Sequence, residues 1–343
     1  MSSGLPKLRA RRIPKWLVPA LGYAISLGCL VWAFKDVDLR EILDNLKSLY
    51  WGWVTVAVVS DIGVYVFQAW RWNLLLRPVV RAPLMRSVQA IYVGLFANEV
   101  LPLRPGELIR SYLQAHWSKL PFSVAFSSAM IERVFDGIWL MLAFVVTTAF
   151  VTLPKVMKEV ARLLGIIVVG AALILALVLF RKHHAHAAVS MTRWGARLQV
   201  LVEDLHLMGN SPSFYLAAFA SVFYLLIQVI PIYALMQGYG LDLSIWPAMV
   251  LLVILRLGTA IPQAPGNVGA FQAVTILALG MFEVDKTTAA GYAVMVWAVI
   301  TLPLLLAGFI ALAITGTKLR ELHRHAKAMA TTPAPPAPRS PSQ

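Results

Sequence analysis

The chain has 343 residues, of which 59% are hydrophobic and 13% are charged, and its mean hydropathy is +0.73. A soluble protein of this length cannot bury so much apolar surface, so the composition argues against the soluble classes and indicates an all-α integral membrane protein. The net charge of +14 lies largely at the two chain ends, without a basic stripe interleaved with aromatic residues, so no nucleic acid is expected as a partner. The single cysteine, Cys29, leaves no thiolate metal site, and neither a metal nor another cofactor is expected.

Residues 1–15 carry five Lys or Arg residues and no acid, which predicts a basic cytoplasmic N-terminus. The first apolar run, 16–34, is too long for the core of a signal peptide and is expected to span the membrane. The further apolar segments predicted in chain order are 51–72, 85–101, 123–151, 163–180, 213–236, 243–261, 267–282 and 288–315. We therefore expect about 6–8 transmembrane helices and one or two re-entrant helical hairpins.

The connections between these segments set the expected topology. Residues 35–50 are amphipathic and of mixed charge, which indicates the far surface, whereas 71–86 carry four arginines and no acid, which indicates the cytoplasm. Residues 181–210 are also expected in the cytoplasm, with an interfacial helix, while 237–244 lack Lys and Arg and should face outward. Because both flanks of 85–118 are basic, this stretch is expected to enter and leave from one face, and the C-terminus returns to the cytoplasm.

Two stretches repeat one pattern of prolines and glycine, since residues 99–107 read EVLPLRPGE and residues 259–267 read TAIPQAPGN. At a constant offset of 160 positions, Pro102, Pro105 and Gly106 match Pro262, Pro265 and Gly266. Short apolar segments that are broken at matching positions of two halves are typical of transporter repeats. The expected halves are 51–151 and 213–315, with the second inverted. A chance recurrence is the alternative, and the charge pattern leaves open whether 243–282 is two spans or a second hairpin.

Nine charged residues lie within or beside apolar segments, where an unpaired charge costs from about 3 to more than 10 kcal/mol. They are Asp61, Glu99, Arg104, Glu107, Arg110, Glu132, Arg133, Asp136 and Arg256. Glu132 and Asp136 are four residues apart on one helix face, so a cation is needed between them, and Arg104 and Arg110 are expected to supply it. Arg133 is expected to point away from that face.

Uncharged polar residues also recur at helical spacing within the apolar segments. Tyr65, Gln68 and Trp72 continue the face of Asp61 along 51–72, and Ser221, Tyr224 and Gln228 form a second stripe along 213–236. Two interpretations of the polar interior stay open. Its charges either form structural ion pairs that hold the helices together, or they form an anion-binding site. For the second, Pro105 and Pro265 would each begin a helix, whose free N–H groups favour a phosphate beside the arginines.

Three strings carry a resemblance to a known family: NEVLPLRPGELIRSYLQ from Asn98, SSAMIERVFDG from Ser127 and APGNVGAFQ from Ala264. They resemble the flippase-like transmembrane domain of lysylphosphatidylglycerol synthases and its stand-alone relatives, over about residues 15–318. The positions that match the family pattern are Asn98, Pro102, Arg104, Gly106, Glu107, Arg110, Glu132, Arg133, Asp136, Pro265, Gly266, Asn267 and Gly269. Gln272 departs from the pattern, where an acid often stands, which puts proton coupling at that position in doubt.

The resemblance implies a lipid flippase or transporter that moves an anionic or charged-headgroup phospholipid between leaflets of a bacterial inner membrane. Residues 16–318 would form the flippase-like domain and 319–343 a basic, then Pro-rich disordered cytoplasmic tail, without a synthase domain and without enzymatic activity. Headgroup binding is expected from Arg104, Arg110, Arg133, Arg256 and Asn98. A charge network or proton coupling is expected from Glu107, Glu132, Asp136 and Asp61.

Two other functions stay open besides the flippase. One is a non-transporting membrane partner of an envelope lipid- or glycan-synthesis complex. The other is an integral-membrane enzyme that acts on a lipid phosphate with Glu107, Glu132 or Asp136 as its acid or base. The lipid moved, the direction, the energy source and the oligomeric state do not follow from the sequence.

Overall fold

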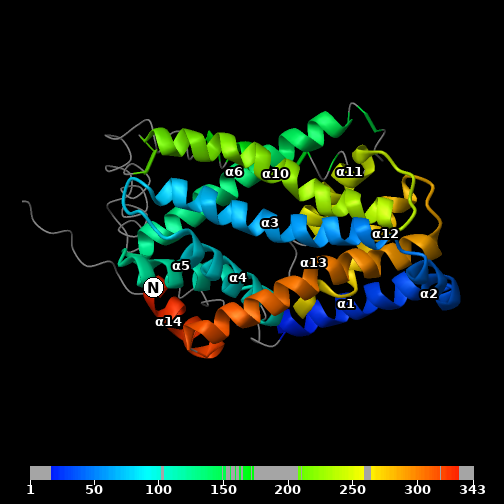
Figure 1. Cartoon of the computed structure of the whole chain (residues 1–343), viewed down its shortest axis with the longest axis horizontal. Helices are drawn as coiled ribbons and strands as arrows, with labels where there is room; N and C mark the ends of the chain where they lie inside the picture. The colour runs from blue at the N-terminus through cyan, green and yellow to red at the C-terminus, as the bar shows by residue number, and fades with distance from the viewer. Residues whose placement is uncertain are drawn as a thin grey trace, which may run out of the picture.

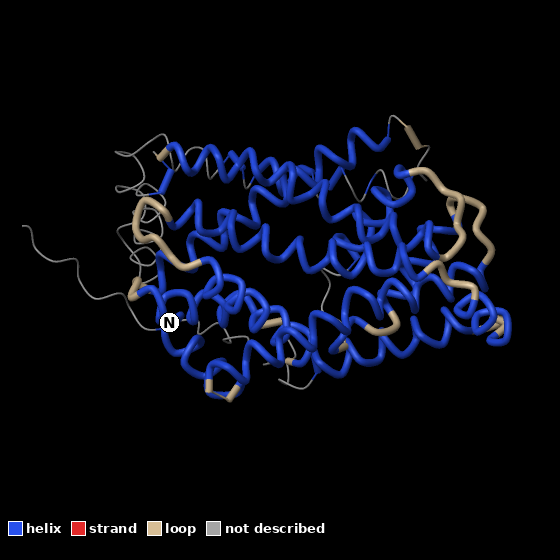
Figure 2. Tube along the Cα trace, viewed as in Figure 1, coloured by secondary structure: helices blue, strands red, loops and turns tan. Residues whose placement is uncertain are grey.

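The fold was obtained as a computed structural model of the whole chain, and it is all-helical, as the sequence predicts (Figure 2). The structure describes residues 17–101, 104–148, 150–151, 155, 159, 162–163, 165–170, 172–173, 208–209, 211–258, 264–316 and 318–331. Within these residues lie eleven α-helices and one short 3-10 helix. The expectations for 1–15, the interfacial helix in 181–210, Pro102, Pro262 and the Pro-rich end of the tail fall outside the described residues.

Three long apolar helices run along the long axis of the molecule: α3 (Trp51–Leu76), α10 (Pro212–Gly238) and α13 (Lys286–Thr315) (Figure 1). Each is long and apolar enough to cross a membrane, because 26 to 30 residues extend over about 39–45 Å. A fourth span results if α1 (Leu17–Phe34) and α2 (Leu39–Lys47), which meet at a bend of 81°, count as one.

The sequence predicted more spans than these three or four, because it counted apolar segments that form short helices in the structure. α4 (Leu84–Val100) and α5 (Gly106–Ser118) contain 17 and 13 residues, and α11 (Ile245–Gly258) and α12 (Ala270–Gly280) contain 14 and 11. None of these four reaches the roughly 30 Å of a hydrocarbon core. α6 (Phe122–Thr148) has 27 residues but carries three charges, and most of the predicted segment 163–180 lies outside the described residues.

α4 and α5 pack against each other as an antiparallel hairpin. Ser87, near the start of α4, donates to Gln114, near the end of α5, at 3.2 Å. At the other end, the Gly106 N–H donates to Asn98 Oδ1 at 2.7 Å. A Cβ on Gly106 would lie 2.1 Å from the carbonyl oxygen of Gly94, so only glycine permits this approach. The sequence predicted that Pro105 is the first helical residue, whereas it is the N-cap, one position earlier.

α11 and α12 form the corresponding second pair. A Cβ on Gly258, at the end of α11, would lie 3.0 Å from the Val274 side chain in α12. The prediction that the second helix starts at Pro265 is wrong, because α12 begins only at Ala270. Pro265 starts the 3-10 helix η1 (Pro265–Asn267), and the chain then passes through left-handed backbone at Gly266 (φ 73°) and Gly269 (φ 90°), which interrupts any longer helix.

The two halves share one order of elements at the offset of 160 residues. α3, α4, α5 and α6 correspond to α10, α11, α12 and α13, as long, short, short and long helices. α3 and α10 run antiparallel, because the Tyr50 N–H donates to the Gly238 carbonyl at 3.0 Å while Arg71, near the other end of α3, donates to Ser221 at 2.9 Å. The first hairpin therefore lies toward one end of the molecule and the second toward the other (Figure 1). This is the geometry that an inverted repeat requires.

The last described helix, α14 (Leu319–Thr331), was not predicted, since the sequence was interpreted there as a basic tail. Leu322 and Ala326 bury their side chains in the cluster that α4 and α5 also line, and the His325 ring packs beside Tyr112 of α5. Its basic side chains stay exposed. An apolar stripe of period 3.6 with charges on the other face explains why this segment folds onto the bundle.

Candidate functional site

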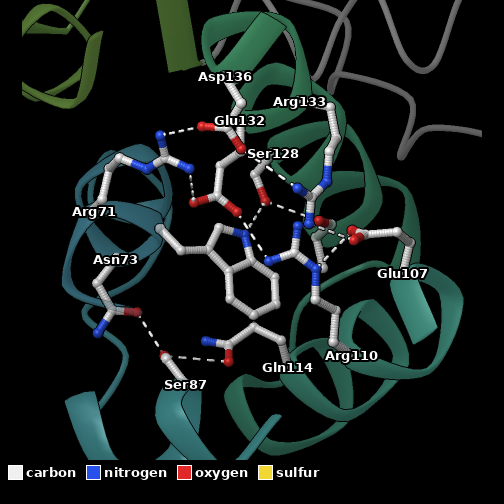
Figure 3. A network of polar contacts seen from close by, with 12 residues as sticks. Arg71, Asn73, Ser87, Glu107, Arg110, Gln114, Ser128, Glu132, Arg133 and Asp136 are labelled. Carbon is white, nitrogen blue, oxygen red and sulfur yellow. Dashed lines mark hydrogen bonds and ion pairs between the residues drawn. The ribbon is translucent and has the colours of Figure 1, made fainter. Parts of the chain in front are cut away.

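Six charged side chains from α3, α5 and α6 form a closed ring of alternating charge inside the bundle (Figure 3). In ring order they are Arg71, Glu132, Arg110, Glu107, Arg133 and Asp136. The N–O distances around the ring, starting from the pair of Arg71 with Glu132, are 3.2, 2.9, 2.7, 2.6, 3.4 and 2.5 Å. Three guanidinium groups meet three carboxylates, so the ring as a whole is neutral. We call these six residues the charge ring.

The cation that bridges Glu132 and Asp136 is Arg71, a role predicted for Arg104 and Arg110. Of these two, Arg110 does pair with Glu132, at 2.9 Å. Arg71 Nη2 lies 3.2 Å from Glu132 Oε1 and its Nη1 lies 2.5 Å from Asp136 Oδ1. The sequence placed Arg71 in the basic connection 71–86. In the structure α3 continues to Leu76, and the Arg71 side chain is 0% exposed. Gln68 stands one helical turn earlier on the same buried face, and this spacing could have identified Arg71 as an inward residue.

Arg133 also differs from its prediction, because it takes part in the ring. Its Nη2 lies 2.6 Å from Glu107 Oε1, and its Nη1 lies 3.4 Å from Asp136 Oδ2. Within α6 alone, Arg133 lies about 100° around the helix from Glu132. Because an Arg side chain is long and α5 lies beside that face of α6, Arg133 still reaches Glu107. With 38% of its side chain exposed, Arg133 is the most accessible member of the ring.

The buried part of the ring is completed by aromatic and hydroxyl groups. Arg110 is 3% exposed and lies over the Trp72 ring at 4.7 Å, while Arg71 lies over the Tyr224 ring at 4.2 Å. The Trp72 indole N–H in turn donates to Ser128 at 2.8 Å. Taking these charges out of water costs several kcal/mol per ion, and close pairing of every member offsets that cost. Two donors, Arg71 Nε and Arg110 Nη2, have no partner among the described residues.

A second polar group lies further along α3 and α10, and both predicted stripes are confirmed as buried. Asp61, Tyr65 and Gln68 of α3 and Ser221, Tyr224 and Gln228 of α10 all point into the bundle. Gln228 donates to the Tyr224 carbonyl at 2.9 Å and accepts a hydrogen bond from Arg256 of α11. Arg256 therefore joins the second hairpin to α10, and it is an exposed residue.

The tips of the two hairpins meet near this polar group. Asn267 Nδ2 lies 3.4 Å from each carboxylate oxygen of Glu99, and the Trp297 indole donates to the Gly266 carbonyl at 2.8 Å. Arg104 adopts left-handed backbone (φ 50°) at the first tip, within electrostatic range of Glu99 and Arg256. Asn98, which was expected to bind a headgroup, accepts from Gly106 and thereby holds the tip closed.

Three of the predicted helix-breaking residues interrupt the helical backbone between α11 and α12. Gly266, Asn267 and Gly269 have positive φ, and a Cβ on Gly269 would lie 2.0 Å from the Ser26 carbonyl of α1. Among the described residues, no group of three or more His, Cys, Asp or Glu side chains could hold a metal ion. The interior thus offers guanidinium groups, carboxylates, amides and phenols, which bind ions and protons.

Comparison with known proteins agrees with the resemblance of the three motifs. A membrane protein of Methanothermobacter thermautotrophicus, described as UPF0104 membrane protein, is 23% identical over 278 residues, which cover 71% of this chain and 77% of that protein. No solved structure matches the chain. A family model described as the lysylphosphatidylglycerol synthase TM region matches residues 20–308, and no synthase domain is matched. The chain is an integral multi-pass membrane protein that belongs to the family of the lysylphosphatidylglycerol synthase transmembrane region.

Proposed function

We propose that this protein is a flippase that carries an anionic-headgroup phospholipid between the two leaflets of a bacterial inner membrane. Transmembrane domains of this family are implicated in lipid translocation, which supports the proposal at the level of the class. The single observation that carries it is the meeting of two oppositely oriented hairpins, through Glu99 and Asn267, inside a charged interior of an apolar bundle. Buried charge at membrane depth is expensive, and it is retained where a polar substrate must pass.

The arginines divide into two sets in this proposal. Arg71 and Arg110 are almost fully buried and hold Glu132 between them, so they build the scaffold. Arg104, Arg133 and Arg256 keep exposed surface near the hairpin tips and would contact the headgroup phosphate. A phosphate can replace Asp136 on Arg133, because that contact is already long at 3.4 Å. The acyl chains would stay in lipid beside the apolar outer faces.

The inverted arrangement supplies a way to alternate access. In the proposed architecture of six to eight spans, with halves 51–151 and 213–315, both termini lie in the cytoplasm and the hairpins enter from opposite faces. Among the described residues, the side-chain hydrogen bonds between the hairpin tips are the two of 3.4 Å from Asn267 to Glu99, which are weak enough to open. Rocking of one half against the other would expose the arginines first to one leaflet and then to the other.

The test is translocation by the purified full chain in proteoliposomes of phosphatidylcholine that contain a fluorescent phosphatidylglycerol. Dithionite added outside bleaches only outer-leaflet label, so its access reports movement between leaflets. We expect Arg133→Gln and Arg256→Gln to reduce the rate at least about tenfold, which corresponds to losing one charge-assisted contact of about 1.4 kcal/mol or more. Arg162→Gln is the matched control, because that side chain is 72% exposed and its ion pair in the described part of the chain is with Glu159.

The alternatives give different results in the same vesicles. A rate equal to that of protein-free vesicles would refute the flippase and favour a non-transporting partner of a lipid- or glycan-synthesis complex. Chemical change of the labelled lipid, detected by chromatography after incubation, would favour an enzyme that uses the carboxylates of the charge ring. Equal rates for wild type, Arg133→Gln and Arg256→Gln would refute the headgroup site while leaving translocation intact.

A further inference from the structure

Among the acidic residues inside the described part of the bundle, Asp61 is the one that belongs neither to the charge ring nor to the hairpin tips. It lies in the middle of α3, is 6% exposed, and forms neither an ion pair nor a hydrogen bond with another described residue. The four other interior acids all have partners: Glu107, Glu132 and Asp136 in the charge ring and Glu99 on Asn267. A buried carboxylate without a close partner is costly as an anion and much less so as an acid.

The charged group that faces Asp61 is the guanidinium of Arg256. α3 and α10 are antiparallel, with Trp53 beside Gly238 and Arg71 beside Ser221, so Gln228 of α10 lies opposite the turn that carries Asp61. Gln228 accepts the hydrogen bond from Arg256. The second hairpin therefore brings a cation into electrostatic range of an acid with which it forms no ion pair.

The remaining titratable and charged neighbours come from α3 itself and from three of the helices that pack against it, α4, α6 and α10. Tyr65 belongs to α3 itself, Tyr92 comes from α4 and packs on Tyr65 with ring centroids 5.4 Å apart, and Tyr224 comes from α10. α6 contributes Asp136, which faces Arg256 from the charge ring. The groups next to Asp61 are thus phenols and one guanidinium.

We propose that Asp61 binds the proton that accompanies the lipid, so that the protein is a proton–lipid symporter in which Arg256 couples the two. When Asp61 is an anion, it neutralises part of the field of Arg256 and weakens the binding of an anionic headgroup there. When Asp61 takes a proton from water, Arg256 loses the attraction of this carboxylate and holds the headgroup in its place. Release of the headgroup on the other side restores the attraction between Arg256 and Asp61, which returns the proton to water. This inference rests on the proposed flippase function.

The stoichiometry follows from the charges. One proton and one phosphatidylglycerol anion move together, so transport carries no net charge and its end point does not depend on the membrane voltage. At equilibrium the product of lipid and proton concentrations is equal on both sides. A gradient of one pH unit therefore concentrates the lipid about tenfold in the leaflet that faces the more alkaline solution, equivalent to about 1.4 kcal/mol. A flippase without a coupled ion leaves the lipid evenly distributed.

The experiment measures the final distribution of fluorescent phosphatidylglycerol in phosphatidylcholine proteoliposomes, with the voltage held at zero by potassium and valinomycin. With an alkaline interior, wild type should protect most of the label from dithionite, and with an acidic interior it should protect little. The Asp61→Asn variant should bring the label to an even distribution under both gradients, at whatever rate it moves lipid. Asp44→Asn, the same change at an exposed acid of α2, should behave as wild type.

The possible outcomes separate this inference from the proposed function. Wild type that moves the lipid to an even distribution under both gradients overturns the proton coupling but keeps the flippase. An uneven distribution that persists in Asp61→Asn overturns the assignment to Asp61. If that variant does not fold, a pH dye trapped in wild-type vesicles decides, because lipid movement without proton movement also overturns the proposal. No lipid movement by wild type is the failure of the flippase itself.

Discussion

Substitution of Arg71 by glutamine tests whether the charge ring holds the bundle together. The change removes a guanidinium that is 0% exposed and lies 3.2 Å from Glu132 and 2.5 Å from Asp136. Glu132, also 0% exposed, keeps Arg110, but Asp136 keeps one ion pair within the ring, the 3.4 Å contact with Arg133. Removing one partner from a buried ion pair costs about 3–5 kcal/mol, and the contact with Tyr224 contributes to the same loss.

The assay is reversible unfolding of the purified protein in mixed micelles, followed by tryptophan fluorescence, as the denaturing detergent fraction is raised. We expect Arg71→Gln to lower the free energy of unfolding by about 4 kcal/mol, close to a thousandfold in the ratio of folded to unfolded protein. Lys47→Gln is the control, because its ion pair with Asp44 is 77% and 71% exposed and is worth at most about 0.5 kcal/mol.

A double-mutant cycle separates lost pairing from lost packing. Adding Asp136→Asn to Arg71→Gln removes the carboxylate that the first change leaves under-compensated, so the double variant should recover at least about 1.5 kcal/mol of the loss. A loss below about 1 kcal/mol for Arg71→Gln, or strictly additive losses in the cycle, would refute the reasoning, because the ring would then be a set of independent contacts.

Three further predictions concern the hairpins. Gly106→Ala should lower the free energy of unfolding by at least about 2 kcal/mol in the same assay, since its Cβ would lie 2.1 Å from a backbone oxygen of α4. A variant as stable as the wild type would contradict the close packing of α4 on α5. Asn98→Ala should cost about 1 kcal/mol through loss of the 2.7 Å bond to the α5 N-terminus, whereas Asn98→Asp should cost less. In a background without the native cysteine, cysteines at Glu99 and Asn267 joined by a short thiol cross-linker should stop lipid translocation until the linker is reduced. Unimpeded translocation by the cross-linked protein would show that the tips need not separate.

The hairpins and the buried stripes could be predicted because their signals are local. The two Pro-Gly strings mark breaks in apolar segments, and a period of 3.6 residues assigns Asp61, Gln68 and Gln228 to inward faces. That Glu132 and Asp136 share a face and need a cation also follows from spacing within α6 alone. These inferences require no knowledge of which helices are neighbours.

Apart from the ion pair of Arg110 with Glu132, the pairing partners could not be predicted, because they depend on how three helices pack. Arg71 lies 65 positions from Asp136 and was interpreted as a topology signal beside three exposed arginines. The role of Arg133 depends on α5 lying beside α6, which brings Glu107 to 2.6 Å. α14 was missed because its apolar face is narrow, with Leu322 and Ala326 buried among basic residues. In each case a residue's environment is set by a second element.

The charge ring also constrains the order in which the protein can be made. Three charges in the middle of α6 would cost roughly 8–10 kcal/mol if that helix entered lipid by itself, and α5 is too short to cross. All six members of the ring come from one stretch of chain, with partners at most 65 positions apart. We therefore expect α3 to α6 to assemble beside the insertion machinery as one unit before they partition into lipid. That unit can form before α10 has left the ribosome, so the second half inserts against a first half whose charges are already neutralised.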